Sequence, residues 1–154
     1  MSKPPVNETV CTNRKAGFRF EILEKLECGI VLLGSEVKSL RDRNASIDEA
    51  YVRIDGEELW LISSHIAPYT FANTQNHEPL RKRKLLVRKH EIRKLRPKVE
   101  QKGLTLVPMR IFFNIRGLAK VTIALARGKT LGDKRQTMKT REHKREMDRA
   151  MRRR

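Results

Sequence analysis

The chain has 154 residues, a length that suggests one domain. Lys and Arg number 35 against 18 Asp and Glu, so the formal net charge is +17 at pH 7. A positive field of this size attracts polyanions, which makes nucleic acid the leading partner class and an anionic membrane surface the second. No run reaches the roughly 18 apolar residues of a spanning helix, and no apolar stretch follows Lys3, so neither a membrane span nor a secretory leader is expected.

The two cysteines, Cys11 and Cys28, do not have the spacing of a metal site such as C-x-x-C. Two free thiols are the simpler interpretation, and they fit a reducing, cytoplasmic environment. The four histidines also lack metal spacing, and neither G-x-S-x-G nor a glycine-rich phosphate loop occurs. The sequence therefore predicts a protein that is not an enzyme and needs neither metal nor cofactor.

In chain order, the polar residues 1–12 contain two prolines and are expected to form a flexible lead. Residues 18–24 alternate apolar and polar side chains, which is the period of a half-buried strand. Residues 28–34 are an apolar run bounded by glycines, which indicates a buried strand, and residues 25–27 predict a hairpin between the two. Residues 35–43 then fit a short helix with a serine N-cap.

Residues 46–54 alternate again, and Asp55-Gly56 is a strong signal for a hairpin turn. Residues 58–63 predict the returning strand. The segment 67–79, with its prolines and asparagines, predicts a loop.

Residues 81–102 have helical spacing of Leu and Ile, which predicts a long basic helix that Pro97 interrupts and Gly103 ends. Residues 104–114 and 118–126 predict two further strands. The count is about six strands joined mostly by short turns, which favours antiparallel pairing. A small closed or partly open barrel would protect the edges of these strands.

The composition changes near Gly128, so the chain divides into a lead (1–12), a body (13–127) and a basic tail (128–154). The tail has few apolar residues and no core-facing stripe. It is therefore expected to be disordered alone and to become ordered on an RNA partner.

Basic side chains cluster at the start of the body, along the predicted 81–102 helix and in the tail. Any one cluster is well explained as a solvated face, but together they predict a surface that follows RNA phosphates. On charge grounds Lys15, Lys38 and Lys120 are candidate phosphate contacts. The few aromatic residues form no ladder with basic ones, which favours recognition of a folded RNA by shape and backbone over stacking on single strands.

Several motifs follow one another in a fixed order. They are NRKA at 13–16, ECGIVL at 27–32, GSEVKSLR at 34–41, AYV at 50–52, HIAPY at 65–69, NHEP at 76–79, RKLL at 83–86, KGLTLVP at 102–108, GK at 128–129 and DKR at 133–135. In this order they resemble the SsrA-binding protein family, also called small protein B, from about Asn13 to the end of the tail.

The resemblance implies a mainly β fold with α: an antiparallel six-stranded OB-like β-barrel with about three helices and a basic C-terminal tail. It also implies an RNA-binding adaptor of trans-translation, which binds the tRNA-like domain of transfer-messenger RNA (tmRNA, or SsrA) and delivers it to stalled ribosomes. There the stalled peptide is tagged and the ribosome is rescued, while the tail becomes helical near the decoding centre and faces ribosomal RNA. A cytoplasmic monomer without membrane contact is expected.

By the same resemblance, the RNA-binding face includes Asn13, Glu27, Leu86 and Arg88. The Glu27 carboxylate can accept hydrogen bonds from base or ribose donors, with an ordinary surface hairpin acid as the alternative. Arg88 stands where relatives more often carry His or Asn, which leaves open a base or a phosphate contact, and Gly132 stands where many carry a bulky ring. The residues expected to contact the ribosome lie in the tail: Lys129, Asp133, Lys134, Arg135, Lys139, Arg141 and Arg145.

Two other classes of protein remain as alternatives. A ribosomal or ribosome-associated structural protein would carry a similar basic body and tail, but would not prefer a tRNA-like RNA over a ribosomal RNA competitor. An RNA-modifying enzyme would need a nucleophile, metal or cofactor motif, which the sequence does not show.

Overall fold

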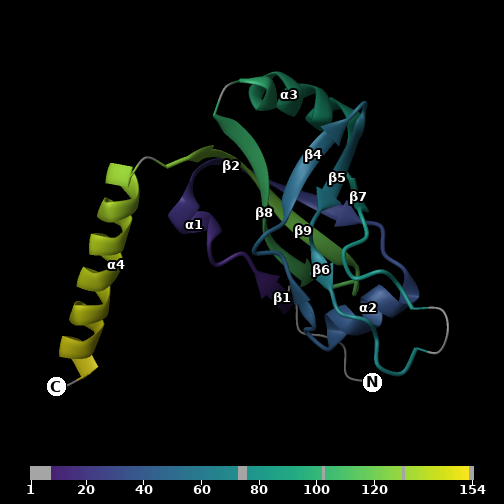
Figure 1. Cartoon of the computed structure of the whole chain (residues 1–154), viewed down its shortest axis with the longest axis horizontal. Helices are drawn as coiled ribbons and strands as arrows, with labels where there is room; N and C mark the ends of the chain where they lie inside the picture. The colour runs from purple at the N-terminus through teal and green to yellow at the C-terminus, as the bar shows by residue number, and fades with distance from the viewer. Residues whose placement is uncertain (1–7, 73–75, 102, 130, 153–154) are drawn as a thin grey trace.

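A ring of antiparallel strands forms the body of the protein, seen in a computed structural model that describes residues 8–72, 76–101, 103–129 and 131–152 (Figure 1). The strands of the ring are β2 (Phe20–Ile30), β4 (Tyr51–Asp55), β5 (Glu58–Ile62), β7 (Arg83–Leu86), β8 (Leu104–Phe113) and β9 (Ala119–Gly128). They follow the order β8-β4-β5-β7-β2-β9, and β9 pairs with β8 to close the ring. Outside it, β1 (Glu8–Thr12) pairs with β8, while β3 (Ala45–Ser46) and β6 (His65–Ile66) pair with each other.

The helices in the described part of the chain are α1 (Ala16–Arg19), α2 (Gly34–Arg41), α3 (Lys89–Glu100) and α4 (Leu131–Arg152). Helix α3 lies across one end of the ring and α2 lies near the other, whereas α4 extends away from the body (Figure 1). The prediction of a mainly β fold with helices is confirmed. The described residues hold four helices rather than about three, because the tail also contains a helix, and three short strands lie outside the six of the ring.

The core fills the inside of the ring because side chains on a strand alternate between its two faces. In β9, Val121, Ile123 and Leu125 are all buried and point inward. Helix α3 adds Ile92 and Leu95 to the same core. Burial of apolar surface at roughly 25 cal/mol per Å² is the main stabilising contribution to such a ring.

A buried ion pair ties α2 to β7. The side chains of Glu36 and Arg83 are both 0% exposed, and Arg83 Nε donates to the Glu36 carboxylate. Arg83 Nη1 also donates to the carbonyl and the hydroxyl of Ser64, at 2.8 and 2.9 Å. Burial by itself would raise the pKa of Glu36, but hydrogen bonds from Arg81, the Leu33 amide and Arg83 outweigh it and hold that pKa below its usual value.

The hairpin predicted at residues 25–27 is wrong, because β2 runs without a turn from Phe20 to Ile30. The segment contains none of the usual turn residues, and Leu26 continues the inward-facing series toward the buried Cys28. An irregularity in the pairing with β9 lies between Ile22 and Glu24, and it accounts for the interrupted alternation in the sequence.

The long helix predicted over residues 81–102 is wrong in its first part. Arg83–Leu86 form β7, paired between β5 and β2, and the helix begins only at Lys89. Pairing with two neighbours overrides the helical spacing. Pro97 does not interrupt α3 either, because it lies in the exposed last turns, where the carbonyl of Arg93 can bind water instead of the missing amide.

The flexible lead predicted for residues 1–12 must be shortened. Residues 8–12 form β1 on the edge of β8, and residues 1–7 lie outside the described residues. The hairpin predicted at Asp55-Gly56 is confirmed: Asp55 pairs with Glu58, and Gly56 has a φ of 61°. The two strands predicted over 104–114 and 118–126 are confirmed as β8 and β9.

Candidate RNA-binding surface

The outer face of β7, β2 and β9 brings together three of the predicted RNA-binding residues around Gly29. Gly29 pairs with Leu86 on one side and with Lys120 on the other. Because Cys28 is buried and side chains alternate, Glu27 and Gly29 both face outward. We call the patch made by Glu27, Gly29, Leu86 and Lys120 the Gly29 surface.

The lack of a side chain at Gly29 keeps this surface shallow. A Cβ atom there would stand 3.2 Å from the Leu86 Cβ, closer than ordinary van der Waals contact. Leu86 is 52% exposed, an unusual state for a leucine in the middle of a sheet. The outward-facing set therefore combines the apolar side chain of Leu86, the carboxylate of Glu27 and the ammonium group of Lys120, on three neighbouring strands.

This mixture suits RNA chemically. A carboxylate accepts hydrogen bonds from base amino groups or from a ribose 2′-hydroxyl, and an ammonium group pairs with phosphate. An exposed leucine can pack against the face of a base or a ribose.

Arg88 follows two residues after Leu86 and is the exposed N-cap of α3, so it borders the Gly29 surface along the chain. Several neighbouring basic side chains already form ion pairs with acidic residues of the protein. Lys84 pairs with Glu58 at 3.1 Å, and Arg93 pairs with Glu57 at 3.4 Å. The basic segment 81–96 therefore offers fewer free cations to RNA than its sequence predicts.

Asn13 and Lys15 belong to a different part of the body, around α1. Asn13 is buried: its Nδ2 donates to the Pro108 carbonyl at 3.0 Å, and its Oδ1 accepts from the Ala16 amide at 3.1 Å. This side chain holds the start of α1 against β8. Lys15 is exposed and pairs with Glu49 at 2.6 Å. An RNA contact by either residue stays a prediction.

Lys38 is exposed on α2, where its Nζ lies 5.5 Å from the centre of the Tyr69 ring. The structure therefore places the predicted RNA-binding residues of the body in three groups, namely the Gly29 surface with Arg88, the α1 corner and α2.

The first residue of the predicted ribosome contacts anchors the tail to α1. Lys129 Nζ donates to the Gly17 carbonyl and to Thr137 Oγ1, each at 2.8 Å. One turn into α4, Lys134 Nζ lies 5.9 Å from the centre of the Phe18 ring. The other predicted tail contacts whose side chains the structure describes are exposed along α4: Arg135, Lys139, Arg141 and Arg145. The side chain of Asp133 lies outside what the structure describes.

Sequence analysis did not single out Gly29 or Thr122, which pairs with Glu27. Val31, 44% exposed and directly after β2, was also missed. Two features connect these residues. One is the alternation that turns side chains of β2 to the outer face of the sheet, and the other is the register between β2 and β9. That register is hidden when a hairpin is expected at residues 25–27.

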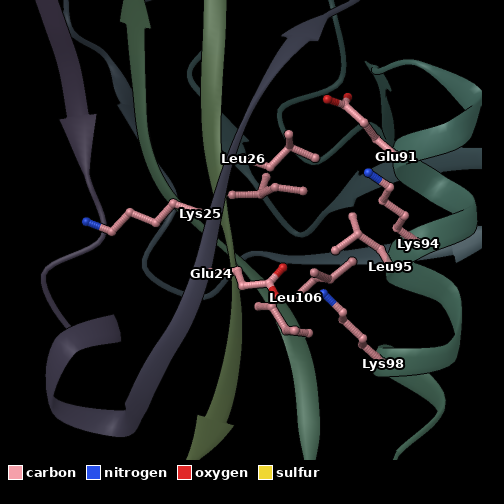
Figure 2. Close-up of a pocket in the computed structure, with 10 residues that line it drawn as sticks. Glu24, Lys25, Leu26, Glu91, Lys94, Leu95, Lys98 and Leu106 are labelled. Carbon is pink, nitrogen blue, oxygen red and sulfur yellow. Dashed lines mark hydrogen bonds and ion pairs between the residues drawn. The ribbon is translucent and has the colours of Figure 1, made fainter.

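A separate cleft of about 200 Å³ lies between α3 and β2 (Figure 2). Leu26, Leu95 and Leu106 line its apolar part, and the Glu24–Lys98 ion pair, 2.6 Å long, spans it. Its described lining contains none of the predicted RNA-binding residues.

Both thiols are free and poorly reactive in this setting. Burial raises the pKa of Cys28 to about 12, with smaller contributions from Glu91 and Glu27, and burial raises the pKa of Cys11 to about 11. Within the described ranges, no three His, Cys, Asp or Glu side chains gather where they could hold a metal ion. No described helix is long and apolar enough to cross a membrane.

Related proteins match almost the whole chain. An SsrA-binding protein of Chelativorans sp. (strain BNC1) is 50% identical over 151 residues, which are 98% of this chain and 97% of the relative. The SsrA-binding protein of Thermosynechococcus vestitus (strain NIES-2133 / IAM M-273 / BP-1) is 54% identical over 143 residues, or 92% of this chain and 93% of the relative.

A solved structure described as "tmRNA-SmpB: a journey to the center of the bacterial ribosome" has a similar fold. It matches with a TM-score of 0.67 and 52% sequence identity, over 79% of this chain and 85% of its own. The model of the family described as "SmpB protein" matches residues 10–153. With relatives, fold and family model in agreement, the chain belongs to the SmpB protein family.

Proposed function

We propose that this protein is an RNA-binding adaptor of trans-translation. It binds the tRNA-like domain of tmRNA and delivers the RNA to stalled ribosomes for peptide tagging and ribosome rescue. The names of its relatives and the tmRNA–SmpB structure support this function. The observation that carries the site is the convergence of Glu27, Leu86 and Lys120 around Gly29.

Each side chain of the Gly29 surface has a role in this proposal. Lys120 neutralises a phosphate, and Glu27 accepts hydrogen bonds from base or ribose donors. Leu86 packs against the apolar face of a nucleotide. Arg88 adds a cation at the edge, where its exposed guanidinium can make a bidentate contact to a phosphate or to a base edge.

The division of labour between body and tail is part of the proposal. The ring binds tmRNA, and its OB-like character fits the oligonucleotide-binding surfaces of that fold. The basic side chains of the tail, from residue 128 onward, contact ribosomal RNA. Asp133, Lys134 and Arg135 lie near the start of this tail. We propose that the α4 helix becomes fully stable only on ribosomal RNA, because its exposed faces bury little apolar surface on the body.

The adaptor acts without catalysis or a cofactor, as a cytoplasmic monomer. Binding and positioning of RNA are sufficient for the role, because the ribosome carries out peptide transfer.

The experiment that tests this function is capture of the tagged protein from cells, followed by sequencing of the bound RNA. We expect tmRNA to be the most enriched species. Enrichment of ribosomal RNA without tmRNA would favour a ribosomal structural protein instead and would overturn the proposal.

A further inference from the structure

Phe71 is the most exposed large apolar side chain among the described residues, with 81% of its surface open to solvent. It follows β6 in the segment 67–72, close to α2. The Tyr69 ring supports it edge-on, with ring centres 5.7 Å apart and an angle of 66° between the planes. This geometry leaves a face of the Phe71 ring free.

The turn that presents Phe71 is held by hydrogen bonds of its own. Asn76 brackets Tyr69, with its Oδ1 accepting from the Tyr69 amide at 3.1 Å and its Nδ2 donating to the Tyr69 carbonyl at 3.0 Å. The Ala72 amide donates to the same carbonyl at 3.0 Å. An exposed aromatic ring on a pinned turn loses little conformational entropy when it binds a ligand.

Helix α2 contacts the same segment, and also His77 beyond it. Ser39 Oγ donates to the Ala67 carbonyl at 2.7 Å, and Ser35 Oγ lies 2.8 Å from His77 Nδ1. Lys38, one residue before Ser39, places its ammonium group over the Tyr69 ring. A cation therefore stands beside the Tyr69 ring, which in turn contacts the Phe71 ring.

An exposed ring beside a cation suits a nucleobase better than a protein side chain. Stacking of a base on an aromatic ring is worth roughly 1–3 kcal/mol, and the neighbouring ammonium group can neutralise the phosphate. A protein partner would require a wider apolar patch than one ring. The net charge of +17 also selects a polyanion.

Helix α2 connects this segment to the strand that carries the Gly29 surface. Helix α2 begins at Gly34, four residues after β2 ends at Ile30. Arg81 Nη2 contacts both the Val31 carbonyl and the Glu36 carboxylate, so it joins the end of β2 to α2. One RNA can thus reach both places.

We propose that Phe71, supported by Tyr69 and Lys38, is a stacking site for one unpaired base of the RNA that covers the Gly29 surface. This inference rests on the proposed function. It also adds one stacking contact to the expected recognition of a folded RNA by shape and backbone.

The first test replaces the ring with a fluorescent one. The Phe71→Trp variant is titrated with the isolated tRNA-like domain of tmRNA, and wild type, whose only tryptophan is Trp60, gives the baseline. Stacking predicts additional quenching that saturates with binding. Emission from the new indole that stays unchanged at saturating RNA would overturn the site.

The second test measures affinity for the same RNA. We expect Phe71→Ala and Phe71→Leu to bind about tenfold more weakly, and Phe71→Tyr to stay within about twofold of wild type. Phe71→Leu is the matched control, because it keeps an apolar side chain without a π face. Wild-type affinity in Phe71→Leu would overturn stacking, and wild-type affinity in Phe71→Ala would overturn any contact between Phe71 and this RNA.

Failure of the inference is distinguishable from failure of the proposed function. If Glu27→Ala weakens binding while all Phe71 variants bind normally, only the stacking site falls. If wild type does not bind the tRNA-like domain at all, the proposed function falls, and the stacking site falls with it.

Discussion

At the scale of the residue, Glu27 is the least expected member of a basic RNA-binding surface. It lies within β2, opposite Thr122, rather than in a hairpin, so its carboxylate has a fixed position on the sheet. A carboxylate near phosphates costs electrostatic energy unless it accepts hydrogen bonds from the RNA. Its place beside Leu86 and Lys120 therefore points to recognition of a base or a ribose.

We expect Glu27→Ala to weaken binding of the tRNA-like domain about tenfold or more, because charge-assisted hydrogen bonds contribute roughly 1.5–3 kcal/mol. The free energy of unfolding should change by less than about 0.5 kcal/mol, since the side chain is exposed. Fluorescence anisotropy and urea denaturation measure the two quantities. Glu21→Ala is the control, because Glu21 is an exposed acid on the same strand. Equal losses in the two variants would remove Glu27 from the site.

The cysteines allow a second prediction at this scale. With a pKa of about 12 for Cys28 and about 11 for Cys11, both thiols stay protonated at pH 8. We expect iodoacetamide to modify neither thiol in the folded protein within the time that modifies both in urea, as measured by mass spectrometry. Rapid labelling of Cys28 in native protein would contradict its burial in the ring.

The same pKa values set a pH dependence of stability. The ordinary thiol pKa of 9.0 lies below the folded-state value of about 12 for Cys28, so the unfolded chain loses its proton first. The stabilising contribution is complete below pH 9.0 and is lost as pH rises toward 12.

At the scale of the element, the buried pair of Glu36 and Arg83 joins α2 to β7 and so fixes one border of the Gly29 surface. Glu36→Gln would leave Arg83 charged and buried without an anion. We expect a loss of about 3–5 kcal/mol in the free energy of unfolding, measured by urea denaturation at pH 7. Glu58→Gln, which breaks the exposed pair with Lys84, should cost less than about 1 kcal/mol.

A similar cost in both variants would contradict the structural role of the buried pair. The pH dependence adds a check. Because the pKa of Glu36 is lowered in the fold, its contribution is present above the ordinary value of 4.5 and is lost as pH falls below it. Glu36→Gln should therefore flatten the acid side of the stability profile.

How far the sequence predicts the elements depends on how local their signals are. Strands β8 and β9 and the β4–β5 hairpin have clear alternation or turn residues. Strand β7 has only four residues, and its pairing with β5 and β2 comes from distant parts of the chain. Local spacing therefore predicts a helix there, and the true start of α3 is missed.

The candidate site was predictable residue by residue but not as a surface. Resemblance to a family indicates Glu27 and Leu86, and charge indicates Lys120. Their convergence on Gly29 depends on the register of three strands, which no local pattern contains. Local patterns also do not show that Asn13, predicted to contact RNA, is buried. Its side chain donates a hydrogen bond to the distant Pro108 carbonyl.

At the scale of the whole molecule, the ring is complete without the tail, since it closes between β8 and β9. We expect a chain truncated before Asp133 to bind the tRNA-like domain within about twofold of wild type, because the Gly29 surface is untouched. The same chain should support no peptide tagging on stalled ribosomes in a reconstituted translation assay. Normal tagging by the truncated chain would refute the division between body and tail.

The central claim is that a specific surface, rather than net charge, binds tmRNA. Lys120→Glu and Arg53→Glu change the net charge equally, but Arg53 lies exposed on β4, three places from β2 in the ring. The decisive measurement is the Kd of each variant for the tRNA-like domain at physiological salt. We predict that Lys120→Glu binds at least about tenfold more weakly than Arg53→Glu. Equal Kd values for the two variants would show that charge alone drives binding and would contradict the account.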